Sequence, residues 1–388
     1  MNSCKFARAL IFVLGLLSAN VFAYNPVFYA DNYYELTSPE GLFGASSVAG
    51  GSIQEATTSS IALNPALIAG EQRYMIDMDY TAIIPILSGD SYAQAAQMGI
   101  IVPSRYGVGA AVVQGVFASG ITGMNLGDSF TVRAAYAKDL TNRLYVGIGL
   151  YGGWGMYTSY AVACDLGFWY MLNKISFLPF LSNARWAMSF TGLGKSFYSP
   201  SATGGLYYGT DKISKFASPF TMRVGFAADF FDLDKFKWGF SVDASAPSFQ
   251  NAVFDIGMQW LIVNMVKIST SWEANIRELI AGVPVATPSA GISVNFSLGS
   301  VAKKKDKLND ASVNAQLAVA ENAGEAENAI KTEKTDKAKM NWAENEMKIS
   351  SAYKNLSEKA NVASMGVTLY IGQEDTSAPE IILWEGED

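Results

Sequence analysis

The clearest shortages in this 388-residue sequence are of histidine, cysteine and charge. Histidine is absent altogether, which excludes Ser-His-Asp hydrolysis, zinc sites built on imidazole and proton shuttling by histidine. Once an N-terminal signal peptide containing Cys4 is removed, only Cys164 remains, so no disulfide can form within the chain. Charged residues make up 16% of the sequence, against roughly 25% in ordinary soluble domains.

A long apolar run is also missing. No stretch reaches the roughly 18 uncharged apolar residues that a spanning helix needs, although 50% of the residues are hydrophobic and 13% are aromatic. A chain this apolar without a spanning helix is typical of a closed transmembrane β-barrel, which satisfies its backbone hydrogen bonds between strands. A large soluble β-protein is the alternative. The net charge of −7 argues against nucleic acid as a partner.

The first 23 residues have the features of a secretory signal peptide. Lys5 and Arg8 supply a positive start, a short apolar run follows, and Val21-Phe22-Ala23 places small residues at the positions that a signal peptidase reads. The mature chain is therefore expected to begin near Tyr24, outside the cytoplasm.

Residues 73–300 are dominated by alternation of apolar and polar residues. Between residues 73 and 84 every even position is apolar or aromatic, whereas the charged residues Arg73, Asp77 and Asp79 hold odd positions. The same pattern recurs at 128–138, 220–231, 236–244, 254–260, 266–273 and 291–298, and less regularly at 94–102, 106–117, 143–155, 161–172 and 184–194. These twelve segments, with 362–371 and 380–385, predict an all-β antiparallel barrel of about fourteen strands.

Ionisable residues keep to one face of these segments. A lipid-facing Arg or Lys near the bilayer midplane costs roughly 2–4 kcal/mol, whereas a charge in the lumen can be hydrated or paired. We therefore expect a shared lumenal orientation for Arg133, Arg223, Asp229, Asp243, Asp255, Lys267 and Glu273. The aromatic residues of the opposite face suit interfacial girdles.

One inward face is unusually poor in charge. It carries Tyr145, Gly147, Gly149, Tyr151 and Gly153, opposite an aliphatic outer face. Small and aromatic residues there could line a cavity for an apolar chain. Alternatively, the glycines could simply permit curvature of the barrel wall. Both interpretations remain open at this point.

A short motif lies between the signal peptide and the first strand. Asn64-Pro65-Ala66 is followed by Leu67 and Ile68, and a Gly-Leu-x-x-Ala pattern occurs about twenty residues earlier, at 41–45. In these residues the sequence resembles the FadL family of outer-membrane long-chain fatty acid and hydrocarbon transporters. It also resembles a spirochaete-like branch of that family with an inserted helical segment.

The resemblance implies an N-terminal hatch that blocks the barrel and uptake of a fatty acid, hydrocarbon or other small apolar molecule. It places the protein in the outer membrane of a Gram-negative-type (diderm) bacterium, with outer-membrane lipid around it. A fatty acid also needs a cation for its carboxylate, and inward-facing Arg133 or Arg223 could supply one. The alternative function is that of a general porin or a surface-exposed interaction or adhesion barrel.

Residues 301–361 are alanine-rich and densely charged, which predicts an inserted helical hairpin. Its second helix would carry Trp342, Ile349, Tyr353 and Leu356 at near-heptad spacing. It would be a solvated spacer, a docking element for a periplasmic partner through 302–360, or an exposed extracellular loop. Two strands after it would place it in the periplasm, and one strand would place it outside. The expected organisation is a signal peptide (1–23), a hatch (24–72), a barrel (73–300), a helical insertion (301–361) and C-terminal barrel strands with a tail (362–388).

Nothing in the sequence predicts an enzyme, a metal site or a cofactor. Gly192-Leu193-Gly194-Lys195-Ser196 is similar to the end of a phosphate-binding loop, but Ser189 stands where that motif needs glycine. The carboxylates of Asp77, Asp79, Asp229 and Asp255 are interpreted as lumen-lining charge rather than as a catalytic pair.

Overall fold

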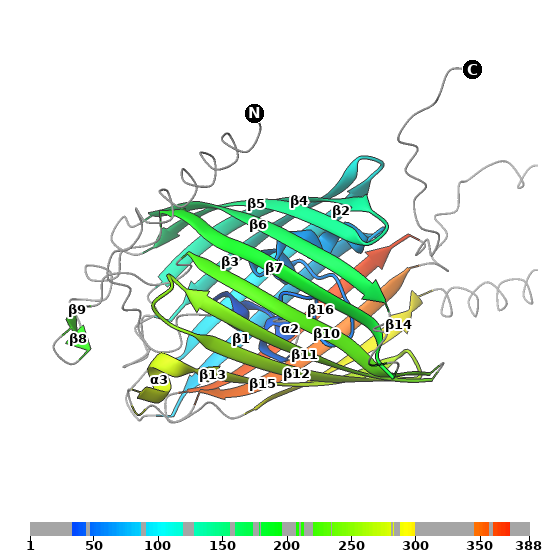
Figure 1. Ribbon diagram of the computed structural model, residues 1–388. Helices are drawn as coiled ribbons and strands as arrows, with labels where there is room; N and C mark the ends of the chain where they lie inside the picture. Colours follow the sequence, from blue (N-terminus) through cyan, green and yellow to red (C-terminus); the bar gives the residue numbers. More distant parts are fainter. Residues whose placement is uncertain are drawn as a thin grey trace, which may run out of the picture.

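We analysed a computed structural model of the chain (Figure 1). It describes residues 33–43, 47–86, 91–118, 128–155, 160–173, 178, 180–195, 207–208, 211–212, 220–233, 235–280, 282, 288–298, 345–356 and 360–372. The predicted signal peptide, the predicted strand at 380–385 and residues 301–344 of the insertion lie outside this set.

Fourteen antiparallel strands form a closed barrel, which confirms the predicted fold class and strand number. The strands are β1 (Tyr74–Pro85), β2 (Ala93–Ser104), β3 (Gly107–Phe117), β4 (Asp128–Thr141), β5 (Leu144–Gly155), β6 (Tyr160–Asn173), β7 (Ser182–Lys195), β10 (Thr221–Leu233), β11 (Phe236–Pro247), β12 (Val253–Ile262), β13 (Val266–Asn275), β14 (Ser289–Ser297), β15 (Glu346–Leu356) and β16 (Ala360–Ile371). Pairing of β1 with β16, from Tyr74↔Ile371 to Pro85↔Ala360, closes the ring. A separate small sheet pairs β8 (Tyr207–Tyr208) with β9 (Asp211–Lys212).

The two ends of the barrel differ in their connections. At the end where β1 begins, β2 joins β3 through 105–106, β4 joins β5 through 142–143, and β12 joins β13 through 263–265. We call this the turn end, and it also carries the long connection 298–345 between β14 and β15. The opposite end, which we call the loop end, carries the connection 196–220 and the short helix α3 (Ile276–Ile280).

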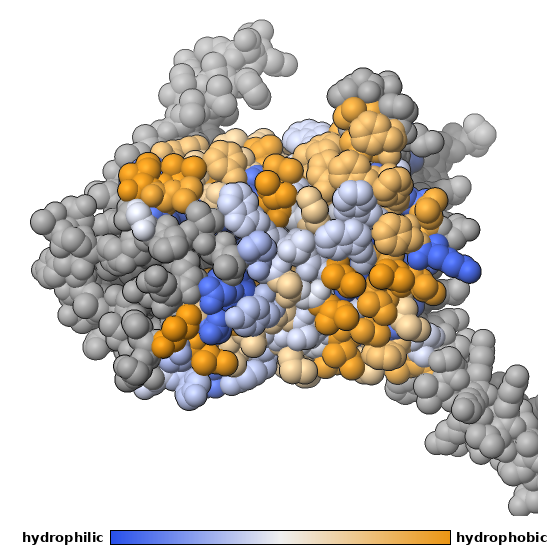
Figure 2. All heavy atoms as spheres, turned by 90° about the horizontal axis from the view of Figure 1, so that it is seen from below, coloured by the Kyte–Doolittle hydropathy of each residue, from blue (hydrophilic) through white to orange (hydrophobic). Residues whose placement is uncertain are grey.

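Side chains alternate between the outside and the lumen along every long strand, as the sequence predicts. In β2 the exposure pattern is strictly alternating, and the outward residues of the barrel include many exposed large hydrophobic residues such as Met78, Ile100 and Leu150. On the side of the barrel that Figure 2 shows, orange and pale residues cover most of the described surface, and strongly hydrophilic residues are few. Among the described residues, no helix is both long and apolar enough to cross a membrane.

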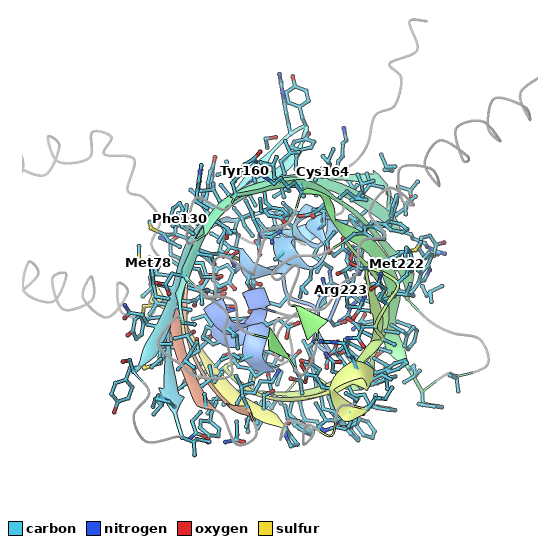
Figure 3. The ribbon with its side chains drawn as sticks, turned by 90° about the vertical axis from the view of Figure 1, so that its left-hand side faces the viewer. Met78, Phe130, Tyr160, Cys164, Met222 and Arg223 are labelled. Atoms are coloured by element: carbon cyan, nitrogen blue, oxygen red, sulfur yellow. The ribbon has the colours of Figure 1, made fainter. Side chains whose placement is uncertain are left out.

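The predicted lumenal orientation of the charged residues is confirmed. Arg133, Arg223, Asp229, Asp243 and Lys267 are buried on the inner face. Asp255 pairs in register with Asp243 on one side and Glu273 on the other, and therefore shares their face. Figure 3 shows Arg223 pointing inward, whereas Met78 and Phe130 point outward.

The lumen is occupied by the residues that precede β1. Residues 33–43 and 47–72, which we call the lumen segment, form η1 (Tyr33–Thr37), α2 (Pro39–Phe43), η2 (Ser59–Ala62) and η3 (Pro65–Gly70). Viewed along the barrel in Figure 3, these elements lie inside the ring of strands. Their short helical turns are not stable alone, and the wall that surrounds them supplies their packing.

The predicted second helix of the insertion is wrong for residues 346–361. Residues 346–356 form β15 and residues 360–371 form β16. Within β15, Ile349 and Tyr353 face outward, whereas Lys348, Lys354 and Leu356 are buried inside. The density of charge in this region suggested a solvated helix. In the barrel, Lys348 and Lys354 instead occupy inward positions of a strand, where carboxylates pair with them. Two strands therefore follow the insertion, and both of its ends lie at the turn end.

Candidate functional site

The Asn64-Pro65-Ala66 motif forms a capped turn against the inner wall. Asn64 is extended, with φ −155° and ψ 106°, as expected before proline. Its Oδ1 accepts a hydrogen bond from the Ala66 N–H at 2.9 Å, and its Nδ2 donates to the carbonyl oxygens of Val48 (2.9 Å) and Phe168 (3.2 Å). The motif thus ties η3, the earlier part of the lumen segment and β6 together in the turn-end half of the barrel.

Glycines on the wall make room for this turn. A Cβ on Gly147 of β5 would come closer than 3.0 Å to the backbone of Pro65 and Ala66, and one on Gly167 of β6 would collide with the Asn64 side chain. The same holds for other inward glycines and other parts of the lumen segment: Gly99 meets Thr58, Gly225 meets Val48, Gly239 meets Ser52 and Gly291 meets Phe43. A Cβ on Gly366 would meet Asp79 of β1 first and would come within 3.1 Å of Pro39. The glycines therefore allow the lumen segment to approach the strands closely.

The predicted lining residues of β5 do face the lumen, but protein atoms cover them. Gly147 contacts the motif, and Gly149 lies against Asp165 of β6. Tyr145 packs on the buried Trp169 with ring centroids 4.4 Å apart, and Tyr151 is buried. Gly153 is buried on the same face. This stretch of wall is a packing surface rather than the side of an open cavity.

The two predicted ligand-carboxylate contacts have different surroundings. Arg133 forms an ion pair with Asp165, 3.1 Å between Nη1 and Oδ2, and both side chains are 2% exposed. Its guanidinium also lies 4.4 Å from the Tyr151 ring centroid. Arg223 is buried on β10, closer to the loop end. A fatty-acid carboxylate at Arg133 would have to compete with Asp165, which the sequence could not reveal.

A tetrad of alternating charges joins the lumen segment to β13 and β15. Lys348 Nζ lies 3.1 Å from Glu40 Oε1 and 2.6 Å from Glu55 Oε1, and Lys267 pairs with the other oxygen of Glu55. Burial raises the pKa of Glu40, but Lys348 and Lys267 outweigh it and hold that pKa below its ordinary value. Both carboxylates belong to the lumen segment and both lysines to the wall.

Strands β7 and β11 also hold the lumen segment, through polar contacts with its backbone. Arg185 of β7, fully buried, donates from Nε to the Ala49 carbonyl at 2.8 Å and from Nη2 to the Gly51 carbonyl at 2.7 Å. Asp243 of β11 accepts from the Val48 N–H at 2.5 Å and from the Ser47 hydroxyl at 2.9 Å. Charge-assisted hydrogen bonds of this kind are about twice as strong as neutral ones.

The lumen has an apolar part towards the loop end. Ile83, Val116, Leu356 and Val362 face inward from β1, β3, β15 and β16, and all are buried. Leu36, Leu42 and Phe43 of the lumen segment belong to the same apolar cluster, which we call the loop-end cluster. Beside it, burial and, after burial, the nearby Glu273 raise the pKa of Glu35 from 4.5 to about 8.

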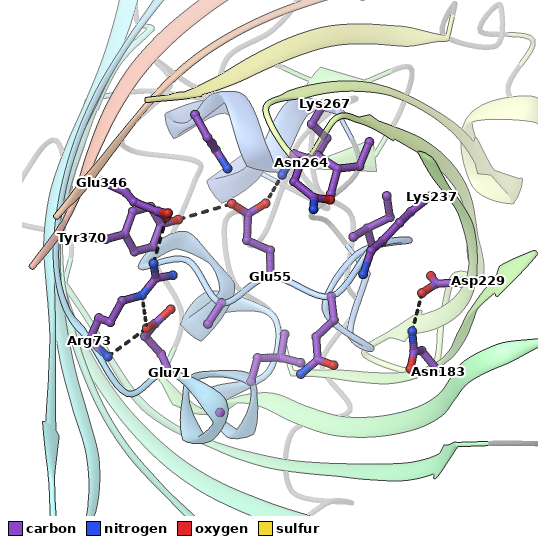
Figure 4. A pocket seen from close by; sticks show the side chains of 17 residues that line it. Glu55, Glu71, Arg73, Asn183, Asp229, Lys237, Asn264, Lys267, Glu346 and Tyr370 are labelled. Atoms are coloured by element: carbon purple, nitrogen blue, oxygen red, sulfur yellow. Dashed lines mark hydrogen bonds and ion pairs between the residues drawn. The ribbon is translucent and has the colours of Figure 1, made fainter. Parts of the chain in front are cut away.

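The turn end, by contrast, opens into a charged pocket of about 600 Å³. Its lining includes Arg73, Lys237 and Lys267 as cations and Glu55, Glu71, Asp229 and Glu346 as anions. Figure 4 shows Glu55 reaching from the lumen segment towards Lys267 and Tyr370. This pocket does not have the apolar lining that the sequence analysis expected of a ligand cavity.

Sequence reasoning missed the charged residues that hold the lumen segment in place. Glu40 and Glu55 lie in a stretch without periodicity, and Lys348 was assigned to a helix. One signal was available for Lys348, because Met347, Ile349, Ser351 and Tyr353 alternate with Lys348, Ser350 and Lys354. The recurrence of glycine at inward positions was a second signal for close packing inside the barrel.

No protein-family model matches the sequence, and no curated protein matches it. Solved structures do show similarity. The CymD monoaromatic hydrocarbon channel superposes with a TM-score of 0.48 and 11% identity, over 87% of this chain and 98% of that one. The Ralstonia pickettii toluene transporter TbuX gives 0.48 and 10%, over 87% and 98%. The Pseudomonas putida toluene transporter TodX gives 0.42 and 10%, over 86% and 97%.

Proposed function

We propose that this protein is an outer-membrane channel for the uptake of small apolar molecules, with the lumen segment as its hatch. The observation that carries the proposal is the unequal lumen: an apolar loop-end cluster lies on one side of the lumen segment and a charged pocket on the other. Transfer of an apolar molecule from water to such a cluster lowers its free energy by roughly 25 cal/mol per Å² of apolar surface buried. Partition into the loop-end half is the first step of the proposed path.

The exterior of the barrel supports the membrane location. Exposed large hydrophobic side chains recur on the outward face of successive strands, and most charged side chains of those strands turn inward, with Lys138 near the turn end of β4 as an exception. Barrels of the outer membrane have short periplasmic turns and longer external loops. The turn end therefore faces the periplasm, and the loop end, with its apolar cluster, faces outward. The connection 298–345 then begins and ends on the periplasmic side, where a partner could reach it.

Uncharged apolar ligands fit the loop-end half better than fatty acids do. Arg133 already has Asp165 as its partner, and Glu35, Asp243, Asp255 and Glu273 surround the nearby cations Arg223 and Lys354. A carboxylate brought there would meet like charge, whereas a hydrocarbon would not. We propose hydrocarbon-like molecules as the class taken up at the loop end.

The alternative function, a general porin, requires an open aqueous lumen. The lumen segment contacts inward glycines on β2, β5, β6, β10, β11, β14 and β16, which argues against a free passage. Deleting residues 33–70 should raise conductance in planar bilayers if the segment is a hatch. Unchanged conductance in a variant that keeps heat-modifiable gel migration would count against the hatch.

Ligand binding is tested at the loop-end cluster itself. Replacing the buried Val116 by Thr adds a hydroxyl without changing the shape of the side chain, and should weaken toluene binding about fivefold, because burying a hydroxyl in an apolar site costs about 1 kcal/mol or more. Val116→Ile is the matched apolar control and should bind toluene as the parent does. Equal toluene affinities for all three proteins, or no toluene binding by any of them, would contradict uptake through this cluster.

A further inference from the structure

Lys138 of β4 is a cation on the outward face of the barrel. It is exposed and follows the outward-facing Tyr136 in the alternation of the strand, whereas Arg133 of the same strand is buried in the lumen. A lipid-facing charge destabilises a barrel near the bilayer midplane and is tolerated near the interface. Lys138 lies close to the turn end, because β4 ends at Thr141. Its long side chain can therefore keep the ammonium group at the level of the lipid headgroups.

Two further cations lie on the turns beside Lys138. Among the described residues, four lysine and arginine side chains are exposed, namely Arg105, Lys138, Arg143 and Lys235. Arg105 belongs to the turn between β2 and β3, and Arg143 belongs to the turn between β4 and β5. The four strands are consecutive around the barrel (Figure 1). Arg105, Lys138 and Arg143 thus gather at one side of the turn end, and we call them the basic turn patch.

The basic turn patch has no anionic counterpart in the described part of the protein. No described carboxylate forms an ion pair with any of its three cations. Asp139 is the nearest acidic residue in the sequence, but it is half-buried and pairs in register with the inward-facing Tyr145. The patch is therefore a positive surface that faces the membrane boundary.

Contacts between the two turns hold the patch together. The Tyr136 hydroxyl of β4 donates to the Tyr106 carbonyl oxygen in the β2–β3 turn at 2.6 Å. The Arg105 guanidinium lies 4.6 Å from the Tyr106 ring centroid. In the β4–β5 turn, the Arg143 N–H donates to Thr141 Oγ1 at 3.3 Å. The cations are thus already gathered in the free protein, which lowers the entropic cost of binding a ligand.

Apolar side chains surround the basic turn patch on the outer wall. Tyr106, Leu140 and Ile148 are all at least half exposed. Tyrosine is enriched where the apolar and aqueous parts of a bilayer meet, and aliphatic residues suit the adjoining acyl chains. The combination of a cationic edge and an apolar wall fits a molecule with an anionic head and apolar chains.

We propose that the basic turn patch binds the phosphate group of an anionic phospholipid, such as phosphatidylglycerol, in the periplasmic leaflet. The choice of leaflet rests on the orientation given under the proposed function, whereas binding to the patch does not depend on it. An arginine guanidinium matches the geometry of a phosphate, and a lysine ammonium adds a compact charge. A zwitterionic lipid carries an ammonium group of its own, which the patch repels, so the patch favours the anionic lipid.

A bimane label on residue 148 reports which lipid occupies the patch. Ile148 is exposed and pairs in register with Tyr136, so Ile148→Cys in a Cys164→Ala background places one label beside the patch of the full-length protein. The labelled protein is placed in phosphatidylcholine vesicles that contain a small fraction of brominated phosphatidylglycerol or brominated phosphatidylcholine. Brominated phosphatidylglycerol should quench the label with an apparent affinity about fivefold higher. Replacing Arg105, Lys138 and Arg143 together by glutamine should abolish this preference.

Lys235→Gln is the matched control, because it removes an exposed turn-end cation that lies before β11, away from the patch. It should keep the preference of the parent. A label on Ile268→Cys, on the outward face of β13, should show no preference. Heat-modifiable gel migration checks that each variant forms the barrel.

Three outcomes would overturn the patch as a lipid site: equal quenching by the two lipids at residue 148, an equal preference at residue 268, or a preference that survives the triple substitution. Loss of the preference in Lys235→Gln would also overturn it. The vesicles present the same lipids to both ends of the barrel, so the result is independent of orientation. Toluene binding is measured on the same proteins, so failure of the proposed function is seen separately.

Discussion

At the scale of single residues, the inward glycines determine how closely the lumen segment approaches the wall. Gly147 and Gly152 both belong to β5, but a Cβ on Gly147 would overlap with the Pro65–Ala66 backbone, whereas a Cβ on Gly152 would have no atom within 4 Å. We expect Gly147→Ala to destabilise the folded protein by about 1–3 kcal/mol, the usual cost of overpacking. Gly152→Ala should be close to neutral. Equal midpoints of guanidinium unfolding for the two variants would contradict this packing.

Glu35 makes stability depend on pH. Its folded-state pKa, raised by burial and by Glu273 from 4.5 to about 8, lies above the unfolded value, so the folded protein binds more protons between these pH values. The contribution of Glu35 to the free energy of unfolding is fully present below about pH 4.5 and is lost as the pH rises towards 8. Glu35→Gln should therefore flatten the decline of unfolding free energy between pH 5.5 and pH 8.5, by about 1 kcal/mol or more. A decline as steep as in the parent would refute the assignment.

The sequence predicted the orientation of the charged residues but not their partners. Alternation places Arg133 and Asp243 inside, because strand parity is local information. Their partners come from other parts of the chain: Asp165 of β6 pairs with Arg133, and Ser47 and Val48 of the lumen segment donate to Asp243. A carboxylate-binding role for Arg133 stays a prediction, and a ligand would have to compete with Asp165 for the guanidinium.

At the scale of elements, β7 holds the lumen segment through one guanidinium. Arg185 donates to the carbonyls of Ala49, Gly51 and Ser52 and so holds three carbonyl groups within four consecutive residues. The ammonium group of a lysine is compact and cannot reach all three carbonyl oxygens at once, as the planar guanidinium does. Arg185→Lys should therefore raise amide hydrogen exchange in residues 47–56 about tenfold or more.

The neighbouring outward residue provides the control for that measurement. Trp186 lies on the lipid-facing side of β7 and is 40% exposed. Trp186→Phe should leave exchange in residues 47–56 unchanged. If exchange in Arg185→Lys matched that of Trp186→Phe, the guanidinium would not be the element that restrains the segment.

Strand prediction succeeded in the regions of clear alternation and failed in β15, which lies at the end of a densely charged, alanine-rich region. The twelve segments between 73 and 300 correspond to β1–β7 and β10–β14, and residues 362–371 fall within β16. The fourteenth strand is β15, whose Lys348 and Lys354 suggested a solvated helix. Those lysines pair with Glu40, Glu55 and Glu273. These carboxylates come close to the lysines only when the barrel closes, so the local sequence around β15 does not reveal the pairing.

At the scale of the whole molecule, the two ends of the lumen differ in chemical character. The loop-end cluster is apolar, and the turn-end pocket is charged. A molecule that moves inward thus leaves a region that stabilises apolar groups and reaches one that stabilises charged groups. Such a gradient favours partition of an uncharged apolar ligand into the loop-end half. It also requires a fixed orientation of the barrel in the membrane.

The orientation follows from the connections and can be tested in intact cells. Tyr92, 80% exposed before β2, lies at the loop end, and Met265, 48% exposed between β12 and β13, lies at the turn end. In a Cys164→Ala background, a membrane-impermeant maleimide should label Tyr92→Cys in intact cells and label Met265→Cys only after lysis. The two sites serve as controls for each other, because both are exposed in the isolated protein. Labelling of Met265→Cys in intact cells with protection of Tyr92→Cys would invert the barrel, place the charged pocket outside and remove the basis for inward release.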